Sequence, residues 1–325
     1  MPLVMHVNPE AFPITWDQFC ESTPPYSIAL DGYVSDVSLF DASAPRANFD
    51  HHSLNKNDST KRDFPGKRID RLITRATCGQ LLIAIRTGLL QCFRDESGVR
   101  AELYVLDGDQ DVCTSWHLVK HSEQIEREYN PRLNRLVSLE DTLDCFGGAY
   151  PLPIDLPDLQ ELAWVFEPYT NFRLSGGVDR KNGNEFVSMI QETEQRICLY
   201  VKEEGSSIPL QTKYDIISSG IGWYMVHEEG AQARTAMVAD GIRAFISVRE
   251  RGDGRYTYTV ARTAPFVRFS VPTILDALNA AEGCTLDRWG GSDTIGGSPH
   301  VAGSKLNPEE VKDIVDHVLS LCRYP

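Results

Sequence analysis

The residues with the clearest chemical potential are an aspartate and two adjacent histidines, Asp50-His51-His52, which follow a short apolar stretch. Imidazole and carboxylate groups together suit Mn, Fe, Zn or Ni better than Ca. The triplet therefore indicates a metal site. A surface pair of histidines that caps a turn is the alternative, and the triplet alone does not decide between the two.

Other strand-like runs in the same half of the chain also stop at side chains that can bind a metal. In a parallel α/β sheet, ligands bind beyond the carboxyl ends of the strands, so these side chains are expected to meet at one edge. Asp109 and Asp111 follow the last of these runs closely, and the sequence leaves open which aspartate faces inward. The runs, each with the residue that follows it, are 2–5 with His6, 26–30 with Asp31, and 101–106 with Asp107.

The order of these motifs resembles that of the DHH phosphoesterase superfamily, which includes RecJ-type nucleases, nano-RNA and cyclic-dinucleotide phosphodiesterases and the family II pyrophosphatases. The resemblance implies an α/β fold, with a parallel-sheet DHH domain followed by a smaller mixed α/β DHH-associated domain. It also implies a site for one or two metal ions, usually Mn²⁺, with Mg²⁺ or Co²⁺ as alternatives. The implied metal ligands are His6, Glu10, Asp31, His51, Asp107 and Asp109.

The first motif departs from the family pattern. Glu10 stands where the superfamily has an aspartate, and Phe12 stands where it has a second one. A carboxylate one methylene longer can still bind a metal, whereas a phenyl ring cannot. The chain therefore resembles a branch with a degenerate first motif, and one ion, two ions or none are all open.

The resemblance extends to the C-terminal half. Residues 290–303 resemble the glycine-rich signature of the DHH-associated domain, and residues 246–249 resemble the arginine-bearing strand that precedes it. Ser298 stands at the usual histidine position. Glycines let backbone N–H groups approach a phosphate, although a purely structural loop is the alternative. The implied substrate-binding residues are Arg249, Gly296, Gly297, Ser298 and His300.

The resemblance assigns different roles within the triplet: His51 binds metal, His52 contacts the substrate phosphate, and Asp50 orients its neighbours. We therefore expect a metal-dependent hydrolase in which activated water cleaves a small phosphodiester or nucleotide, with Arg249 neutralising developing charge. The substrate would be a short oligonucleotide, a cyclic dinucleotide or a nucleoside phosphate. The alternative is a catalytically decayed nucleotide-binding or regulatory protein on the same fold, which Phe12 and Ser298 motivate.

Length and composition allow two ordinary domains, since the chain has 325 residues of which 42% are hydrophobic. The proline-rich segment 150–157 suggests a stiff linker. We therefore expect a metal-binding domain over 1–150, a linker over 151–183 and a substrate-binding domain over 184–325. The segment Ser138–Asp141 fits a capping box, which predicts a helix start near residue 139.

Charge and cysteine content restrict the partners and the compartment. A net charge of −14 disfavours a nonspecific nucleic-acid binder, which would normally be basic. The stretch 56–75 is locally basic and is either a solvated face or an electrostatic funnel. The 8 scattered cysteines lack a C-x-x-C pair, which argues against a zinc cluster and for reduced thiols. We expect a cytoplasmic protein with a small phosphorylated substrate or short nucleic acid as partner and no membrane association, and a homodimer is left open.

Overall fold

The computed structural model describes residues 3–52, 75–96 and 98–321. The chain forms two compact units: unit 1 comprises Met1–Cys145 and Pro157–Ile208, and unit 2 comprises Phe146–Leu156 and Pro209–Pro325. The basic stretch of the sequence analysis lies outside the described residues, apart from Arg75. Within the described residues, no helix is long and apolar enough to cross a membrane.

Unit 1 is built on a five-stranded sheet in the order β1-β7-β2-β4-β3. The first four strands of that order run parallel, and β3 pairs with β4 in the antiparallel direction. The runs expected to be strands are strands, because their short apolar segments are buried between layers of helices. Their bounds are β1 Val4–Val7, β2 Ser27–Leu30, β3 Leu39–Asp41, β4 Arg46–Phe49 and β7 Glu102–Val105.

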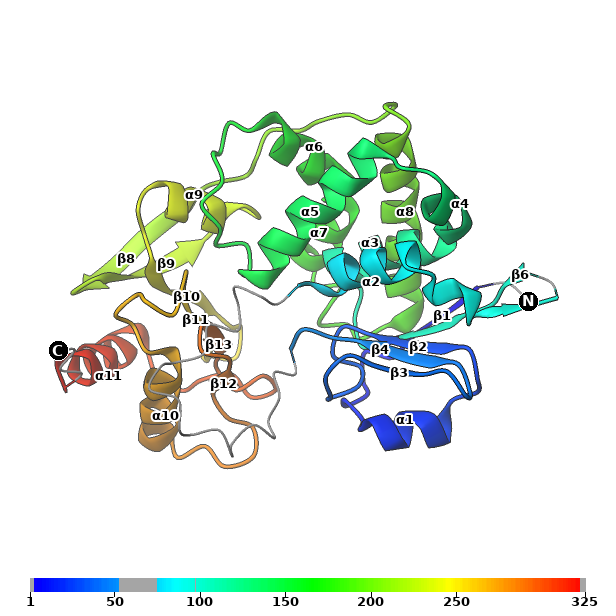
Figure 1. Cartoon of the computed structure of the whole chain (residues 1–325). Helices are drawn as coiled ribbons and strands as arrows, with labels where there is room; N and C mark the ends of the chain where they lie inside the picture. Colours follow the sequence, from blue (N-terminus) through cyan, green and yellow to red (C-terminus); the bar gives the residue numbers. More distant parts are fainter. Residues whose placement is uncertain (1–2, 53–74, 97, 322–325) are drawn as a thin grey trace. The chain divides into compact units, whose positions relative to one another are not determined.

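Helices cover both faces of this sheet (Figure 1). On one face, Phe19 of α1 packs in a buried cluster with Ala29 and Val34. The other helices of unit 1 lie on the opposite face, where α3 packs against α2 and α8. The helices are α1 Trp16–Ser22, α2 Thr77–Arg86, α3 Gln110–Lys120, α4 Ser122–Arg127, α5 Pro131–Cys145, α6 Pro157–Val165, α7 Glu167–Leu174 and α8 Gly183–Val201.

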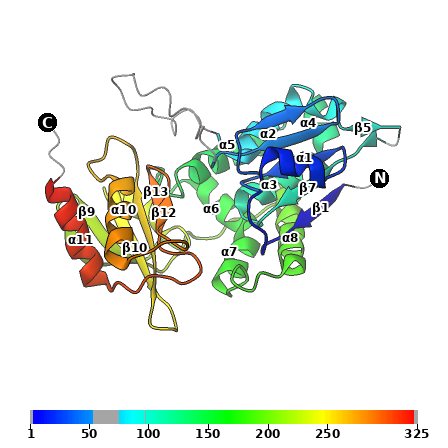
Figure 2. The ribbon, with the colours of Figure 1, turned by 90° about the horizontal axis from the view of Figure 1, so that it is seen from below.

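Unit 2 contains a mixed six-stranded sheet in the order β12-β13-β11-β10-β9-β8, in which only the β9–β10 pair is parallel. Helices α10 and α11 pack on one face (Figure 2). The core beneath them includes Trp223 and Trp289, and α9 packs on the other face. The elements are β8 Tyr214–Gly220, β9 Trp223–Glu228, α9 Ala233–Ala239, β10 Ala244–Glu250, β11 Tyr256–Arg262, α10 Val271–Glu282, β12 Gly290–Gly291, β13 Ile295–Gly297 and α11 Pro308–Leu321.

The chain is thus a mixed α/β protein whose sheets contain parallel strands, as expected. The expected domain bounds differ from the observed units. Residues 151–183 are not a linker, because α6 and α7 pack against α8 within unit 1. Helix α8 therefore belongs to unit 1 and not to the second domain. The helix predicted to start near residue 139 begins at Pro131, so the Ser138 capping pattern lies inside α5.

Candidate metal centre

The carboxyl ends of three parallel strands bring acidic and imidazole groups to one edge of the unit 1 sheet. Asp31 directly follows β2, Asp50 directly follows β4, and Asp107 lies two residues beyond the end of β7. The backbone N–H of Asp31 donates to the carbonyl of Phe49 (3.0 Å), which extends the β2–β4 pairing to the strand ends. The convergence expected from the parallel-sheet rule is therefore present in the structure.

Asp31 adopts a conformation that a non-glycine residue rarely takes. Its φ is +50°, and Gly32 follows with a φ of +77°. The left-handed region costs an L-residue of order 1 kcal/mol or more, and such residues cluster at functional sites. The turn places the Asp31 carboxylate, only 6% exposed, between the two histidines of the triplet.

His51 is held in the interior between two carboxylates. Its Nε2 lies 3.3 Å from Oδ1 of Asp31 and 3.0 Å from Oδ2 of Asp144, and the side chain is 4% exposed. Asp144 comes from α5, so the histidine joins a strand end to a helix of the covering layer. A buried imidazole between two acids is a suitable arrangement for a metal ligand.

His52 lies at the rim of the site and is oriented by Asp50. Oδ1 of Asp50 accepts the backbone N–H of His52 (3.0 Å) and lies 3.1 Å from its Nδ1. The side chain of His52 is 58% exposed. Partial burial lowers the pKa of His52, but the hydrogen bond to Asp50 and the charge of Asp31 outweigh it and raise the pKa from 6.5 to about 9. His52 is therefore a cation at neutral pH, and its two contacts with Asp50 fix its orientation.

The two aspartates that follow Asp107 in the sequence also cap helices. Asp109 is the N-cap of α3, where its side chain accepts the N–H of Val112 (2.9 Å). Asp111 is fully buried and accepts the backbone N–H groups of Thr77 (2.7 Å) and Cys78 (2.6 Å) at the start of α2. The residue at the N-cap of α2 makes no side-chain cap bond, so Asp111 supplies that cap from another helix.

These side chains form three overlapping groups in which the ligand atoms of each group lie within 4.8 Å of one another. We call their members together the edge cluster. Asp31 and His51 each belong to two groups, and a carboxylate can bridge two ions because each oxygen can bind one. The groups are Asp31 with His51 and His52, His51 with Asp111 and Asp144, and Asp31 with Asp107 and Asp109.

Mutual repulsion among these acids favours a bound cation. Burial first, and then the charge of Asp111, raises the pKa of Asp31, Asp144 and the neighbouring Glu140 well above the ordinary range. Burial and the charges of Asp31 and Asp107 do the same for Asp109. Oε2 of Glu140, a residue 2% exposed, has no hydrogen-bond partner among the described residues. The donor set thus fits one or two divalent cations, which would neutralise these carboxylates.

The structure does not bring the first motif into the edge cluster. Nε2 of His6 lies 3.1 Å from Glu102, the first residue of β7, and the ring stacks on Tyr104. His6 therefore points toward the amino end of β7, away from the carboxyl end where the cluster lies. Glu10 is exposed, and Phe12 is 84% exposed. His6 and Glu10, which were expected as ligands, therefore lie outside the edge cluster, whereas Asp144, a neighbour of His51, was not expected.

The expected substrate-binding residues lie on the β10–β11–β13 part of unit 2. Arg249 is exposed, and strand register places it on the same sheet face as Gly297. Gly296 has a packing role, because an added Cβ would lie 2.5 Å from Leu275. Ser298 extends the pairing of β13 with β11, because its Oγ accepts the N–H of Tyr258 and its own N–H donates to the carbonyl of Tyr258.

His300 is exposed and lies three residues beyond the end of β13.

No protein-family model and no curated protein matches the chain. The functional assignment therefore depends on the geometry of the edge cluster and on the order of the motifs that form it.

Proposed function

We propose that this protein is a metal-dependent phosphoesterase that hydrolyses a small phosphodiester or nucleotide. The observation that carries the proposal is the edge cluster, in which Asp31 and His51 are shared between overlapping groups of ligands. The order of Asp31, the Asp50-His51-His52 triplet and Asp107 resembles that of DHH phosphoesterases, and this resemblance supplies the reaction class.

Mn²⁺ is the ion that we propose, with Mg²⁺ and Co²⁺ as alternatives, because the ligands are carboxylate oxygens and imidazole nitrogens. When bound, the cation would act as a Lewis acid and lower the pKa of a water molecule. Asp31 would hold it through its carboxylate, whose Oδ1 lies 3.3 Å from Nε2 of His51 and 3.4 Å from Nδ1 of His52. His51 would bind through Nε2, the atom that lies closest to Asp31 and Asp144.

His52 would neutralise the charge that develops on the phosphoryl oxygens. Its ring is exposed at the rim and positively charged at neutral pH, and its bonds to Asp50 fix its orientation before the substrate arrives. Such preorganised donors lower a barrier because they need no rearrangement during the reaction. Arg249 is proposed, from the resemblance alone, as a second phosphate contact, for which a guanidinium fork is well suited.

The proposal is tested with a panel of dinucleotides, cyclic dinucleotides, nucleoside bisphosphates and pyrophosphate, assayed with Mn²⁺, Mg²⁺ or Co²⁺ and with EDTA. We expect hydrolysis of at least one substrate that requires a divalent ion. Asp31→Asn should reduce kcat/KM on the order of 10³-fold. Asp17→Asn is the matched control, because Asp17 is exposed on α1, on the other face of the sheet. Equal activity of Asp31→Asn and Asp17→Asn would reject the proposal.

One observation favours a second candidate, a catalytically decayed nucleotide-binding or regulatory protein. Phe12 stands where the resemblance expects a carboxylate ligand, and it is 84% exposed. This candidate predicts binding of a nucleotide from the panel without turnover under any metal condition. Measured manganese content separates the two candidates further, since one manganese ion or none favours the decayed protein.

A further inference from the structure

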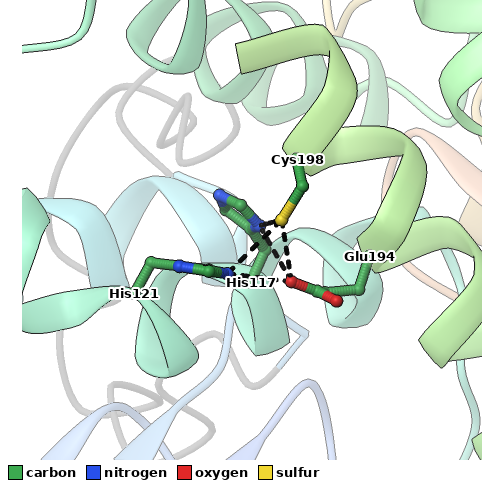
Figure 3. Close-up of side chains that lie close together, drawn as sticks. All are labelled: His117, His121, Glu194 and Cys198. Carbon is green, nitrogen blue, oxygen red and sulfur yellow. Dashed lines mark hydrogen bonds and ion pairs between the residues drawn. The ribbon is translucent and has the colours of Figure 1, made fainter. Parts of the chain in front are cut away.

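A second group of metal-binding side chains lies in unit 1, between helices α3 and α8 (Figure 3). His117 and His121 are four residues apart at the C-terminal end of α3, and Glu194 and Cys198 are four residues apart in α8. Residues at this spacing share one helix face, so each helix presents two side chains to the other. We call these four residues the helix cluster, and the function proposed above does not use them.

The four ligand atoms converge on one small volume. Oε1 of Glu194 lies 2.8 Å from Nε2 of His121, 3.1 Å from Sγ of Cys198 and 3.7 Å from Nδ1 of His117. The sulfur lies 3.5 Å from Nε2 of His121 and 3.9 Å from Nδ1 of His117. In a tetrahedral zinc site with ordinary bond lengths, neighbouring ligand atoms lie about 3.3–3.7 Å apart. The observed separations bracket that range.

We propose that His117, His121, Glu194 and Cys198 form a structural zinc site that joins α3 to α8.

The identity of the ion follows from the ligand types. A thiolate with two imidazoles and a carboxylate suits Zn²⁺, whereas the oxygen-rich edge cluster suits Mn²⁺ or Mg²⁺. Four protein ligands complete a tetrahedron, which is typical of structural sites and leaves no position for a substrate. Binding releases the thiol proton of Cys198 to solvent, so one thiolate and one carboxylate balance the charge of the ion.

The surroundings of the helix cluster favour this arrangement. Nζ of Lys120 lies 2.8 Å from Oε2 of Glu194, which leaves Oε1 for the ion. His117 and Glu194 are 3% exposed, and the side chain of His121 is 33% exposed, so the cluster is shielded on the side of His117 and Glu194 and open on the side of His121. A cavity of about 180 Å³, lined in part by His121, Gln124 and Cys198, adjoins the site and gives an ion access to it.

The site would fix the helix that carries part of the edge cluster. Asp109 and Asp111 lie at the N-terminal end of α3, and the two histidines lie at its C-terminal end. A zinc ion between α3 and α8 would stabilise the position of the whole helix against its neighbour. The helix cluster shares no residue with the edge cluster, so zinc binding there is independent of the proposed function.

The test is a measurement of metal content and of cobalt spectra on the full chain. We expect purified protein to carry one zinc ion that Cys198→Ser loses and that Cys92→Ser keeps. Cys92 is the matched control, since it is an exposed cysteine of the same unit. Co²⁺ added to the zinc-free wild type should give a thiolate-to-cobalt charge-transfer band and the visible spectrum of tetrahedral Co²⁺. The band should be lost in Cys198→Ser, whereas Asp31→Asn should keep it.

A third measurement covers the case in which Cys198→Ser fails to fold. A zinc chelator should lower the melting temperature of the wild type, and added Zn²⁺, but not Mg²⁺, should restore it. Absence of a thiolate band in the wild type would overturn the proposal. Zinc content unchanged by Cys198→Ser would also overturn it, and the four residues would then form a hydrogen-bonded network only.

Discussion

Replacing Asp111 by asparagine separates its two roles, the cap of α2 and the binding of a cation. The carboxylate accepts two backbone N–H groups at 2.7 and 2.6 Å from a fully buried position, and it belongs to a group with His51 and Asp144. Asparagine keeps one acceptor oxygen and turns an amide donor toward the second N–H. The variant therefore loses one charge-assisted hydrogen bond and one negative charge.

In the metal-free protein, these two losses have opposite effects on the free energy of unfolding. A hydrogen bond to a charged group contributes about 1.5–3 kcal/mol to the free energy of unfolding. Against this, the charge of Asp111 is the largest charge effect on the pKa of Asp31, Glu140 and Asp144, so its removal relieves repulsion. With Mn²⁺ bound, the cation already neutralises this repulsion. The substitution then removes a hydrogen bond and a metal-binding carboxylate without relieving any repulsion. Asp111→Asn is therefore expected to destabilise the metal-loaded protein more than the metal-free one.

The size of the difference follows from mass action. Mn²⁺ at 100 times its Kd stabilises the folded state by about 2.7 kcal/mol, and a tenfold weaker affinity removes about 1.4 kcal/mol of this. At roughly 2–4 °C per kcal/mol, the Mn²⁺-induced rise in melting temperature should be smaller by about 3–6 °C in Asp111→Asn than in the wild type. Thermal unfolding with Mn²⁺ and with EDTA measures this quantity.

Asp141 provides the matched control for the cap. Its Oδ1 accepts the N–H of Ala76 (2.7 Å) at the same end of α2, and among the described residues it belongs to none of the metal-binding groups. Asp141→Asn should lower the melting temperature equally with Mn²⁺ and with EDTA. If Asp111→Asn and Asp141→Asn show the same Mn²⁺-induced rise as the wild type, Asp111 does not contribute to a cation site.

Three further outcomes are expected. Because burial and neighbouring charges raise the pKa of Asp31, Asp109 and Asp144 in the folded protein, the folded state keeps protons that the unfolded chain releases above pH 3.8. The melting temperature in EDTA should therefore fall as the pH rises from about 4 to 8, and a flat profile would argue against a strained carboxylate cluster. His52→Gln should lower kcat/KM on the order of 100-fold in the phosphoesterase assay while the Mn²⁺-induced melting shift persists, and full activity would exclude His52 from catalysis. Gly296→Ala should destabilise unit 2 by about 1–3 kcal/mol in urea unfolding, because the new Cβ meets Leu275, and a neutral effect would indicate that Gly296 is not constrained by packing.

The predictable part of the candidate site is the set of residues that follow a strand. Asp31, the triplet and Asp107 each follow a short apolar run, and parallel pairing brings such positions to one edge whatever the remaining topology. His6 also follows an apolar run, yet its side chain turns toward Glu102, because strand alternation and stacking on Tyr104 decide where it points.

Long-range packing decided what the sequence could not show. Asp144 lies near His51 because α5 begins at Pro131 and presents this residue to the sheet edge. The capping pattern at Ser138 indicates neither the start of α5 nor the side chain that faces the sheet. Helices α6 and α8 belong to unit 1 because α8 packs against both α3 and α6, and no local sequence pattern indicates these contacts.

The helix cluster shows the same limit. The pair His117 and His121 and the pair Glu194 and Cys198 each have a spacing that a sequence displays. A search for C-x-x-C does not find them, because the ligands come from two helices more than 70 residues apart along the chain. Only the packing of α3 on α8 joins the two pairs.

The central claim is that the carboxyl edge of the unit 1 sheet binds a divalent cation. Anomalous diffraction at the manganese edge, from crystals of the full chain grown with Mn²⁺, tests it most directly. We expect an anomalous peak within bonding distance of both Asp31 and His51. An anomalous map without a peak at these two side chains, with Mn²⁺ bound elsewhere or nowhere, would contradict it.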